Sequence, residues 1–172
     1  DWYETNVVSQ VKLHEELRHL NSLIKYVHVT TPEAYGSTDG RVTEHFNYAP
    51  TTPYAVSKAA CDLHLLTFLK KYRFPVVFTR AANVYGPGQQ IYRIIPRTML
   101  YARMGKKLHL HSGGRAVRSF IHIKDVVEAT NRIALEGTVG QAYHIATNEM
   151  VSIRELVMKI CRLTNVCFSS FV

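Results

Sequence analysis

The hydrophobic and polar positions of this chain follow two alternating patterns. Apolar residues at helical spacing predict helices near residues 2–20, 53–72, 94–104, 123–137 and 152–164. Short, mostly apolar runs between them predict the strands IKYVHVT (24–30), PVVFTR (75–80), KLHLH (107–111), VRSFIHI (117–123) and AYHIA (142–146). Strands that alternate with helices are typical of an α/β fold with a parallel sheet.

Polar residues at the expected helix ends support this assignment. Thr51 or Thr52 can cap the second helix, with Pro53 in its first turn. Ser152 and Glu155 form the capping-box pattern at the start of the last helix. These signals predict where two of the helices begin.

Two expected strands end in segments rich in polar and turn-forming residues. TTPEAYG (30–36) follows the first strand, and RAANVYGPGQQ (80–90) follows the second and continues as a Gly- and Pro-rich loop over 83–90. Ligand sites of parallel sheets lie at the carboxyl ends of the strands. We therefore expect both segments to line one crevice.

The composition narrows the possible functions. The 172 residues carry a net charge of +8, but the basic residues are scattered and no apolar run could span a bilayer. We therefore expect no nucleic-acid surface and no membrane segment, whereas single arginines could bind a phosphate. The odd number of cysteines (Cys61, Cys161 and Cys167) predicts free thiols in a reducing, cytoplasmic setting.

Histidines are frequent on the expected strands. They are His28, His109, His111, His122 and His144. Their spacings match no metal motif, and the cysteines show none either. The sequence therefore predicts no metal site.

The segment YAVSK carries the first candidate chemistry. Tyr54 and Lys58 share one face of the expected helix, because residues four apart are neighbours on a helix. A nearby ammonium lowers the pKa of a phenol, and the phenolate can then take a proton from a sugar hydroxyl. Thr31, at a strand end, can hydrogen-bond the same hydroxyl.

Further blocks extend this pattern into a family resemblance. The blocks are ETNVV, VTTPEAYGS, TPYAVSKAACD, RAANVYGPGQ, IIPR, RSFIHIKDV and GQAYHIA. In this order they resemble the extended short-chain dehydrogenases/reductases, in particular the NAD-dependent epimerase/dehydratase family. The resemblance is strongest to the nucleotide-sugar 4,6-dehydratases of the dTDP-glucose type, and it extends to about Leu163.

The resemblance implies NAD as cofactor, a nucleotide-diphosphate sugar as substrate, and a role for single residues. Tyr54 would take the proton of the sugar C4 hydroxyl, Lys58 would bind the nicotinamide ribose, and Thr31 would orient the C4 oxygen. Glu33 would remove the C5 proton before water leaves C6. Asn6 and Tyr54 would also belong to the cofactor site. The residues implied to bind the substrate, besides Thr31, are Asn83, Arg93 and Arg118.

One departure from the family pattern leaves the reaction open. The dTDP-glucose enzymes carry an aspartate between the Thr and the Glu, where it serves as acid for the leaving C6 hydroxyl, but this chain has Pro32. Glu33 or a water molecule could take that role, as in relatives with serine there. The alternatives are a 4-epimerase, a UDP-glucuronate decarboxylase, or a non-catalytic truncated relative.

A second departure concerns the extent of the chain. No G-x-x-G-x-x-G fingerprint is present, although in this family it precedes the block ETNVV. We expect the C-terminal part of a Rossmann-like doubly wound parallel sheet and part of a small substrate domain, without the N-terminal glycine-rich half. Residues 1–90 would be the partial NAD-binding domain with the catalytic residues. Residues 91–172 would be mostly substrate-binding, interleaved with Rossmann elements near 117–145, and the isolated chain would be weakly active or inactive.

Relatives of this kind commonly form homodimers through two helices. In this chain those helices are expected at 2–20 and 53–72. The apolar residues Leu63, Leu66 and Phe68 would then lie partly at the interface.

Overall fold

The computed structural model of this protein describes residues 1–38 and 40–172. They form two compact units, the first of residues 1–81 and 126–145 and the second of residues 82–125 and 146–172. Within these described ranges, no helix combines the length and the apolar character needed to cross a membrane. The functional division into a cofactor part and a substrate part stays a prediction.

A parallel sheet forms the centre of the first unit. Its strand order is β1 (Tyr26–Thr30), β2 (Val76–Ala81) and β6 (Ala142–Ile145), and both pairings are parallel. Five of the six residues of β2 are buried, as expected for the central strand of a sheet covered on both faces. The expected α/β fold with a parallel sheet is confirmed.

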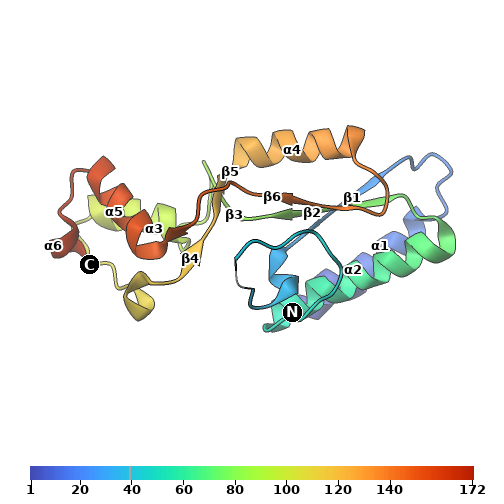
Figure 1. Cartoon of the computed structure of the whole chain (residues 1–172), viewed down its shortest axis with the longest axis horizontal. Helices are drawn as coiled ribbons and strands as arrows, with labels where there is room; N and C mark the ends of the chain where they lie inside the picture. Colours follow the sequence, from blue (N-terminus) through green and yellow to red (C-terminus); the bar gives the residue numbers. More distant parts are fainter. Residues whose placement is uncertain (39) are drawn as a thin grey trace. The chain divides into compact units, whose positions relative to one another are not determined.

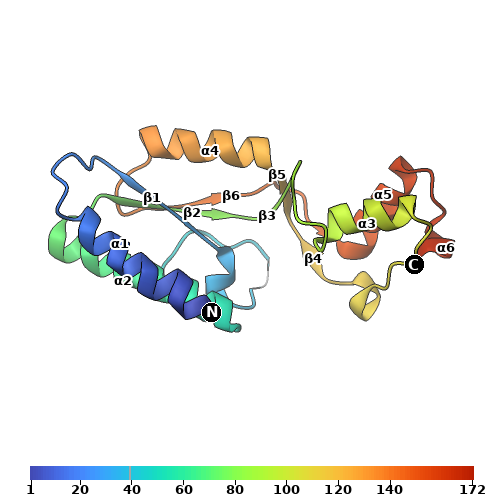
Figure 2. The same cartoon turned by 180° about the vertical axis from the view of Figure 1, so that it is seen from behind.

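Helices cover both faces of this sheet. The helices α1 (Ser9–Leu17) and α2 (Pro53–Tyr72) lie on one face and α4 (Ile123–Glu136) lies on the other (Figure 1), as the view from behind also shows (Figure 2). A single π-helical turn, η1 (Glu4–Val8), precedes α1 and also packs on α2. A short 3₁₀ helix, η2 (Pro32–Tyr35), follows β1 directly.

The core of the first unit lies between α2 and the sheet. Its buried members are Cys61, Leu65, Phe68, Phe74, Val76, Phe78 and Ala142. The helix contributes Cys61, Leu65 and Phe68. Phe74, Val76 and Phe78 come from β2 and the segment before it, and Ala142 comes from β6. Burial of these side chains fixes which face of α2 is turned to the sheet.

The second unit is built from short elements. They are β3 (Asn83–Tyr85), α3 (Ile94–Arg103), η3 (His111–Gly114), β4 (Val117–Arg118), β5 (Phe120–His122), β7 (Val151–Ser152), α5 (Ile153–Leu163) and α6 (Phe168–Phe171). The strands β3 and β5 pair in parallel, and β4 pairs with β7 in antiparallel orientation. The helices α3, α5 and α6 enclose a second core of Ala102, Leu108, Val157, Cys161 and Phe171.

Two strand assignments made from the sequence need correction. The expected strand 107–111 is wrong, because residues 107–110 lie in no strand and His111 begins η3. Its alternating pattern does reflect one-sided burial, since Leu108 is buried and its N–H donates to the carbonyl oxygen of Phe171 at 2.8 Å. The expected strand 117–123 is interrupted at Ser119, and its halves β4 and β5 join different sheets.

The loop expected over 83–90 is also partly wrong. Its first three residues form β3, which pairs with β5. The Gly and Pro residues that suggested a loop begin only at Gly86, so they end this strand and do not exclude it.

The capping box of α5 is confirmed and gives a stability prediction. The Ser152 hydroxyl accepts a hydrogen bond from the Glu155 N–H at 3.1 Å, and the Glu155 carboxylate accepts one from the Ser152 N–H at 2.8 Å. The change Ser152→Ala leaves a helix N–H without this partner, so we expect the free energy of unfolding to fall by about 1 kcal/mol. Urea denaturation measures this loss. The change Ser37→Ala at an exposed position is the control, and an equal loss in both variants would contradict a specific capping effect.

Candidate active site

The turn after β1 is built by Thr31 and Pro32. Thr31 has extended backbone angles and caps η2, and its hydroxyl oxygen accepts a hydrogen bond from the Glu33 N–H at 3.2 Å. Pro32 occupies the first helical position, where a missing N–H costs nothing. This places the buried Thr31 and the exposed Glu33 at the carboxyl end of β1.

A glycine closes this turn against the segment that follows. Gly36 has a φ of +81°, a conformation that L side chains rarely adopt. A Cβ at this position would lie 2.0 Å from the carbonyl oxygen of Ala49. The close approach of the two backbones therefore requires glycine after η2.

The N-terminus of α2 positions Tyr54. Of the two threonines considered as caps, Thr52 is the one used, because its side chain accepts a hydrogen bond from the Ala55 N–H at 3.1 Å. Tyr54 is half-buried in the first turn, and the ring of Trp2 stands edge-on to it with centroids 5.1 Å apart. The helix packs on both η1 and η2, so Tyr54 belongs to the same side of the unit as the turn after β1.

Lys58 joins α2 to the end of β1. Its ammonium donates a hydrogen bond to the carbonyl oxygen of Val29 at 2.9 Å, two residues before Thr31. Burial lowers the pKa of Lys58, and the nearby carboxylate of Asp62 opposes this shift. The ammonium is thus held beside the strand end, one helical turn from Tyr54.

Asn6 contacts the same helix through Ser57. The Asn6 side-chain amide donates to the Ser57 hydroxyl at 3.0 Å, and that hydroxyl donates to the carbonyl oxygen of Tyr54 at 2.7 Å. This chain of hydrogen bonds ties η1 to the first turn of α2. In the structure Asn6 is therefore a residue that positions the backbone of Tyr54.

A buried polar network between α2 and the sheet supports the elements that carry these residues. The Arg80 guanidinium, fully buried on β2, lies 3.3 Å from the Asp62 carboxylate on α2. It also donates to the hydroxyls of Tyr35 and Tyr48 and, at 2.8 Å, to the carbonyl oxygen of His45. The network joins the sheet, α2, η2 and the segment after η2.

The charge of Asp62 is stabilised within this network. Burial by itself raises the pKa of its carboxyl group, but contacts from His28 and Tyr48 reverse this, so the pKa lies below its usual value. The Tyr48 hydroxyl donates to the carboxylate at 2.6 Å, and His28 Nε2 lies 3.2 Å from it. Asp62 is therefore ionised where it faces Arg80.

The predicted site residues fall into two groups. Asn6, Thr31, Glu33, Tyr54 and Lys58 belong to the first unit and gather around the end of β1 and the start of α2. The assignment of catalytic roles to them stays a prediction.

The predicted substrate-binding residues belong to the second unit. The Asn83 amide donates to the carbonyl oxygen of Ser119 at 3.1 Å. Arg93 precedes α3 and lies over the ring of Tyr92, with 5.5 Å between guanidinium and ring centroid. Arg118 is exposed on β4 and contacts the carbonyl oxygen of Val117 at 2.8 Å. Their role in binding also stays a prediction.

Sequence reasoning missed three residues that support the site. They are Ser57, Asp62 and Arg80, none of which stood out by spacing. A signal existed for Arg80, because an arginine inside the apolar run PVVFTR must either point to solvent or find a buried acidic partner. Asp62 lies four residues after Lys58 and is that partner.

Comparison with known proteins identifies the family. The family model described as GDP-mannose 4,6 dehydratase matches residues 1–169. The chain belongs to this family. The expected resemblance to the epimerase/dehydratase branch of the short-chain dehydrogenases/reductases is thereby confirmed.

Individual relatives agree with this assignment. The human dTDP-D-glucose 4,6-dehydratase is 37% identical over 140 residues, which cover 81% of this chain and 40% of that protein. The crystal structure of dTDP-glucose 4,6-dehydratase from Bacillus anthracis in complex with NAD matches with a TM-score of 0.91 at 37% identity, over 98% of this chain and 54% of that chain. A UDP-glucuronic acid 4-epimerase from Bacillus cereus, in complex with UDP-glucuronic acid and NAD, matches with a TM-score of 0.87 at 28% identity, over 94% and 52%.

The chain is short compared with these proteins. It spans between a quarter and about half of the length of the relatives and structures that it matches. The expected C-terminal part of a Rossmann-like fold agrees with this partial coverage.

The Arg80–Asp62 pair gives a prediction for the stability of the site. The change Asp62→Asn keeps the shape of the side chain but leaves the buried guanidinium without its counter-ion. We expect the free energy of unfolding to fall by about 3–5 kcal/mol, measured by urea denaturation. The matched control is the exposed pair of Arg132 and Glu136 on α4, where Arg132→Ala should leave the unfolding midpoint unchanged. A small effect of Asp62→Asn would show that the network does not hold the first unit together.

Proposed function

We propose that this chain forms the catalytic part of a cytoplasmic, NAD-dependent nucleotide-sugar 4,6-dehydratase. The substrate would be a nucleoside-diphosphate hexose, and the product its 4-keto-6-deoxy form. The observation that carries the proposal is the hydrogen bond of Lys58 to Val29. It holds the ammonium at the strand end that leads into Thr31 and Glu33, one turn from Tyr54.

In this proposal Tyr54, Thr31 and Glu33 act on the sugar. The Tyr54 phenolate takes the proton of the C4 hydroxyl, while Thr31 donates a hydrogen bond to the same oxygen. Its cap interaction uses only a lone pair of the hydroxyl oxygen, so the hydroxyl hydrogen is available for this contact. Glu33, exposed at the end of β1, takes the C5 proton once the 4-keto group has made it acidic.

The residues around the end of β1 fit a nicotinamide cofactor. NAD, when bound, accepts the hydride from C4 and supplies the hydride that reaches C6. An ammonium has three donors, and Lys58 uses one for Val29, which leaves donors for the hydroxyls of the nicotinamide ribose. The structures of related enzymes in complex with NAD support this cofactor.

The second unit would bind the nucleotide diphosphate. Arg93 and Arg118 carry exposed guanidinium groups, whose paired donors match the oxygens of a phosphate. Asn83 would contact the sugar or the adjacent phosphate. The net charge of +8 favours an anionic substrate of this kind.

A 4-epimerase is the second candidate, because Pro32 occupies the position where the dTDP-glucose 4,6-dehydratases carry an acid. An epimerase needs no proton at C6 and would keep Tyr54, Lys58 and Thr31. The match to the UDP-glucuronic acid 4-epimerase of Bacillus cereus supports this alternative. Glu33 favours dehydration, since epimerisation at C4 requires no base at C5.

The proposed function predicts the product and its dependence on Tyr54. The test uses the longest protein that the gene encoding these 172 residues produces. In the presence of NAD, we expect this protein to remove one water molecule from one nucleotide-hexose without net formation of NADH. Mass spectrometry of a substrate panel measures this. The change Tyr54→Phe removes the base and should lower turnover by about 10²–10⁴-fold, whereas Tyr72→Phe at the exposed end of α2 should not. A product of unchanged mass would indicate an epimerase and loss of carbon dioxide would indicate a decarboxylase, and either would contradict the dehydratase assignment.

We further propose that the protein is a homodimer that associates through α1 and α2. These helices expose apolar side chains, among them Leu13 and Leu63, and an open groove runs between them. Of the other expected interface residues, Phe68 belongs to the core and Leu66 packs against it. Leu63 is therefore the residue whose exposure best fits an interface.

The dimer predicts a change in mass with Leu63→Lys. A lysine here would place a charge in an apolar contact, so we expect the variant to elute as a monomer where the unmodified protein is a dimer. Light scattering after size-exclusion chromatography measures the mass. Leu135→Lys on α4, where the leucine is even more exposed, is the control and should remain dimeric. A monomeric unmodified protein would contradict the proposal.

A further inference from the structure

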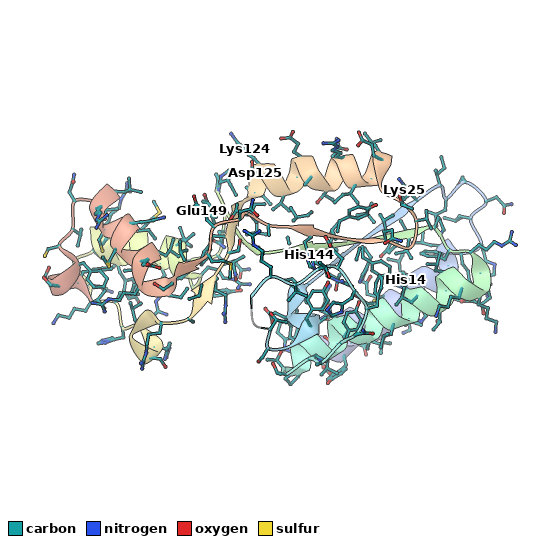
Figure 3. All side chains as sticks on the ribbon, in the orientation of Figure 1. His14, Lys25, Lys124, Asp125, His144 and Glu149 are labelled. Carbon is teal, nitrogen blue, oxygen red and sulfur yellow. The ribbon has the colours of Figure 1, made fainter. Side chains whose placement is uncertain are left out.

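Three side chains with metal-binding atoms meet in the interior of the first unit. They are His14 on α1, His28 on β1 and Cys61 on α2, and all three are buried. One nitrogen or sulfur atom from each lies within 4.8 Å of the other two. Figure 3 labels His14 on the side of the sheet that α1 and α2 cover. None of these residues has a part in the proposed dehydratase chemistry.

The His14 ring has one nitrogen paired and one unpaired. Nε2 lies 3.1 Å from the Tyr26 hydroxyl, whereas Nδ1 is buried and has no hydrogen-bond partner among the described residues. A buried polar atom without a partner destabilises the folded state. An apolar side chain would avoid this cost, so the buried and unpaired Nδ1 indicates a ligand.

The His28 ring has the surroundings of a metal-binding histidine. Its Nε2 lies 3.2 Å from the Asp62 carboxylate. In metal sites a carboxylate commonly contacts the ring nitrogen that does not bind the ion, and so fixes the orientation of the imidazole. Asp62 is itself anchored by Arg80 and Tyr48. His28 Nε2 makes no hydrogen bond to any described residue, so this approach fixes the position of the carboxylate beside the ring and not the ring itself.

The protonation states set the conditions for binding. Burial, together with His28 and His64, lowers the pKa of His14 to about 4, so its ring is neutral and able to bind a cation. Burial also raises the pKa of the Cys61 thiol to about 12. A bound cation must therefore displace the thiol proton, which passes to solvent as the metal–sulfur bond forms.

We propose that His14, His28 and Cys61 form a binding site for a thiophilic cation, Zn²⁺ or Cu⁺. Imidazole nitrogen and thiolate sulfur are the ligands that these ions prefer, whereas Mg²⁺ and Ca²⁺ require oxygen ligands. The three ligands come from α1, β1 and α2, so the ion would link both helices to the sheet beneath the predicted active site. The proposal does not depend on the dehydratase assignment.

A further histidine, His64, lies between this cluster and a groove on the surface. The groove between α1 and α2 is lined by His64 together with Lys12, Glu15 and Glu16 and the apolar residues Val11, Leu13 and Phe68. The His64 ring stacks on that of His14 with centroids 5.5 Å apart, and its Nε2 is buried without a hydrogen bond to any described residue.

Titration of the untagged, metal-free protein, produced as the longest natural gene product that contains these residues, with Zn²⁺ and, under reducing conditions, with Cu⁺ tests the proposal. We expect one equivalent to bind in competition with a chromophoric chelator and to raise the melting temperature, because a ligand that binds only the folded state stabilises it. Co²⁺ as a probe should give the absorption of a metal–thiolate bond. Response to only one of the two ions identifies the natural ligand chemistry.

Variants separate this site from adventitious binding at surface histidines. His14→Leu and Cys61→Ala each remove a ligand, so we expect each to weaken binding by more than about 100-fold, the loss typical when only a hydrogen-bond partner of a ligand is removed. Cys61→Ala should also abolish the thiolate absorption band. His14→Leu fills the same space with an apolar group, and circular dichroism verifies its fold. His109→Leu, which removes an exposed histidine, and Cys161→Ser should bind as the unmodified chain does. Absence of one-equivalent binding, or its persistence in folded His14→Leu, would overturn the proposal.

Discussion

The buried Arg80 guanidinium is the constraint on which the arrangement of the first unit depends. A guanidinium does not lose its charge in a protein, and its removal from water is costly unless its donors find fixed acceptors. Asp62, the hydroxyls of Tyr35 and Tyr48, and the carbonyl oxygen of His45 supply them for the two terminal nitrogens, whereas Nε has no hydrogen-bond partner among the described residues. These acceptors come from α2, from η2 and from the segment after it. Satisfying one side chain of β2 therefore fixes three other parts of the chain.

This constraint reaches the predicted catalytic residues through α2. Asp62 is one helical turn beyond Lys58, which is one turn beyond Tyr54, so anchoring the middle of the helix also fixes its beginning. Two further contacts hold that beginning, the hydrogen bond of Lys58 to Val29 and the link from Asn6 through Ser57. Catalytic groups need supporting contacts of this kind because small displacements reduce the rate strongly.

The sequence predicted those features that depend on local pattern. The helix at 53–72 and the capping box of α5 have the predicted residues, because periodicity and caps are read from neighbouring positions. The predicted strand at 107–111 was wrong because alternating apolar residues indicate only that one side of a segment is buried. A strand also needs a neighbouring strand whose backbone can form hydrogen bonds with it. The Arg80–Asp62 pair and the cluster of His14, His28 and Cys61 join residues far apart in the chain. Only the fold brings such residues together, so spacing could not reveal them.

In the turn Thr31-Pro32-Glu33, the fold explains the first two residues, whereas only the proposed reaction explains the third. A hydroxyl cap followed by proline is a sufficient reason for the first two residues, because it starts η2 at the end of β1. Glu33 has no such reason, since only its backbone N–H takes part in the cap while its side chain remains exposed. In the proposed dehydration, the carboxylate that takes the C5 proton becomes an acid, and the hydroxyl leaving C6 needs one proton. Glu33 then returns this proton to the C6 oxygen, and the proton that C5 takes up with the returning hydride is balanced by the one that Tyr54 removed from the C4 hydroxyl. The protons therefore balance without an acid at the position of Pro32.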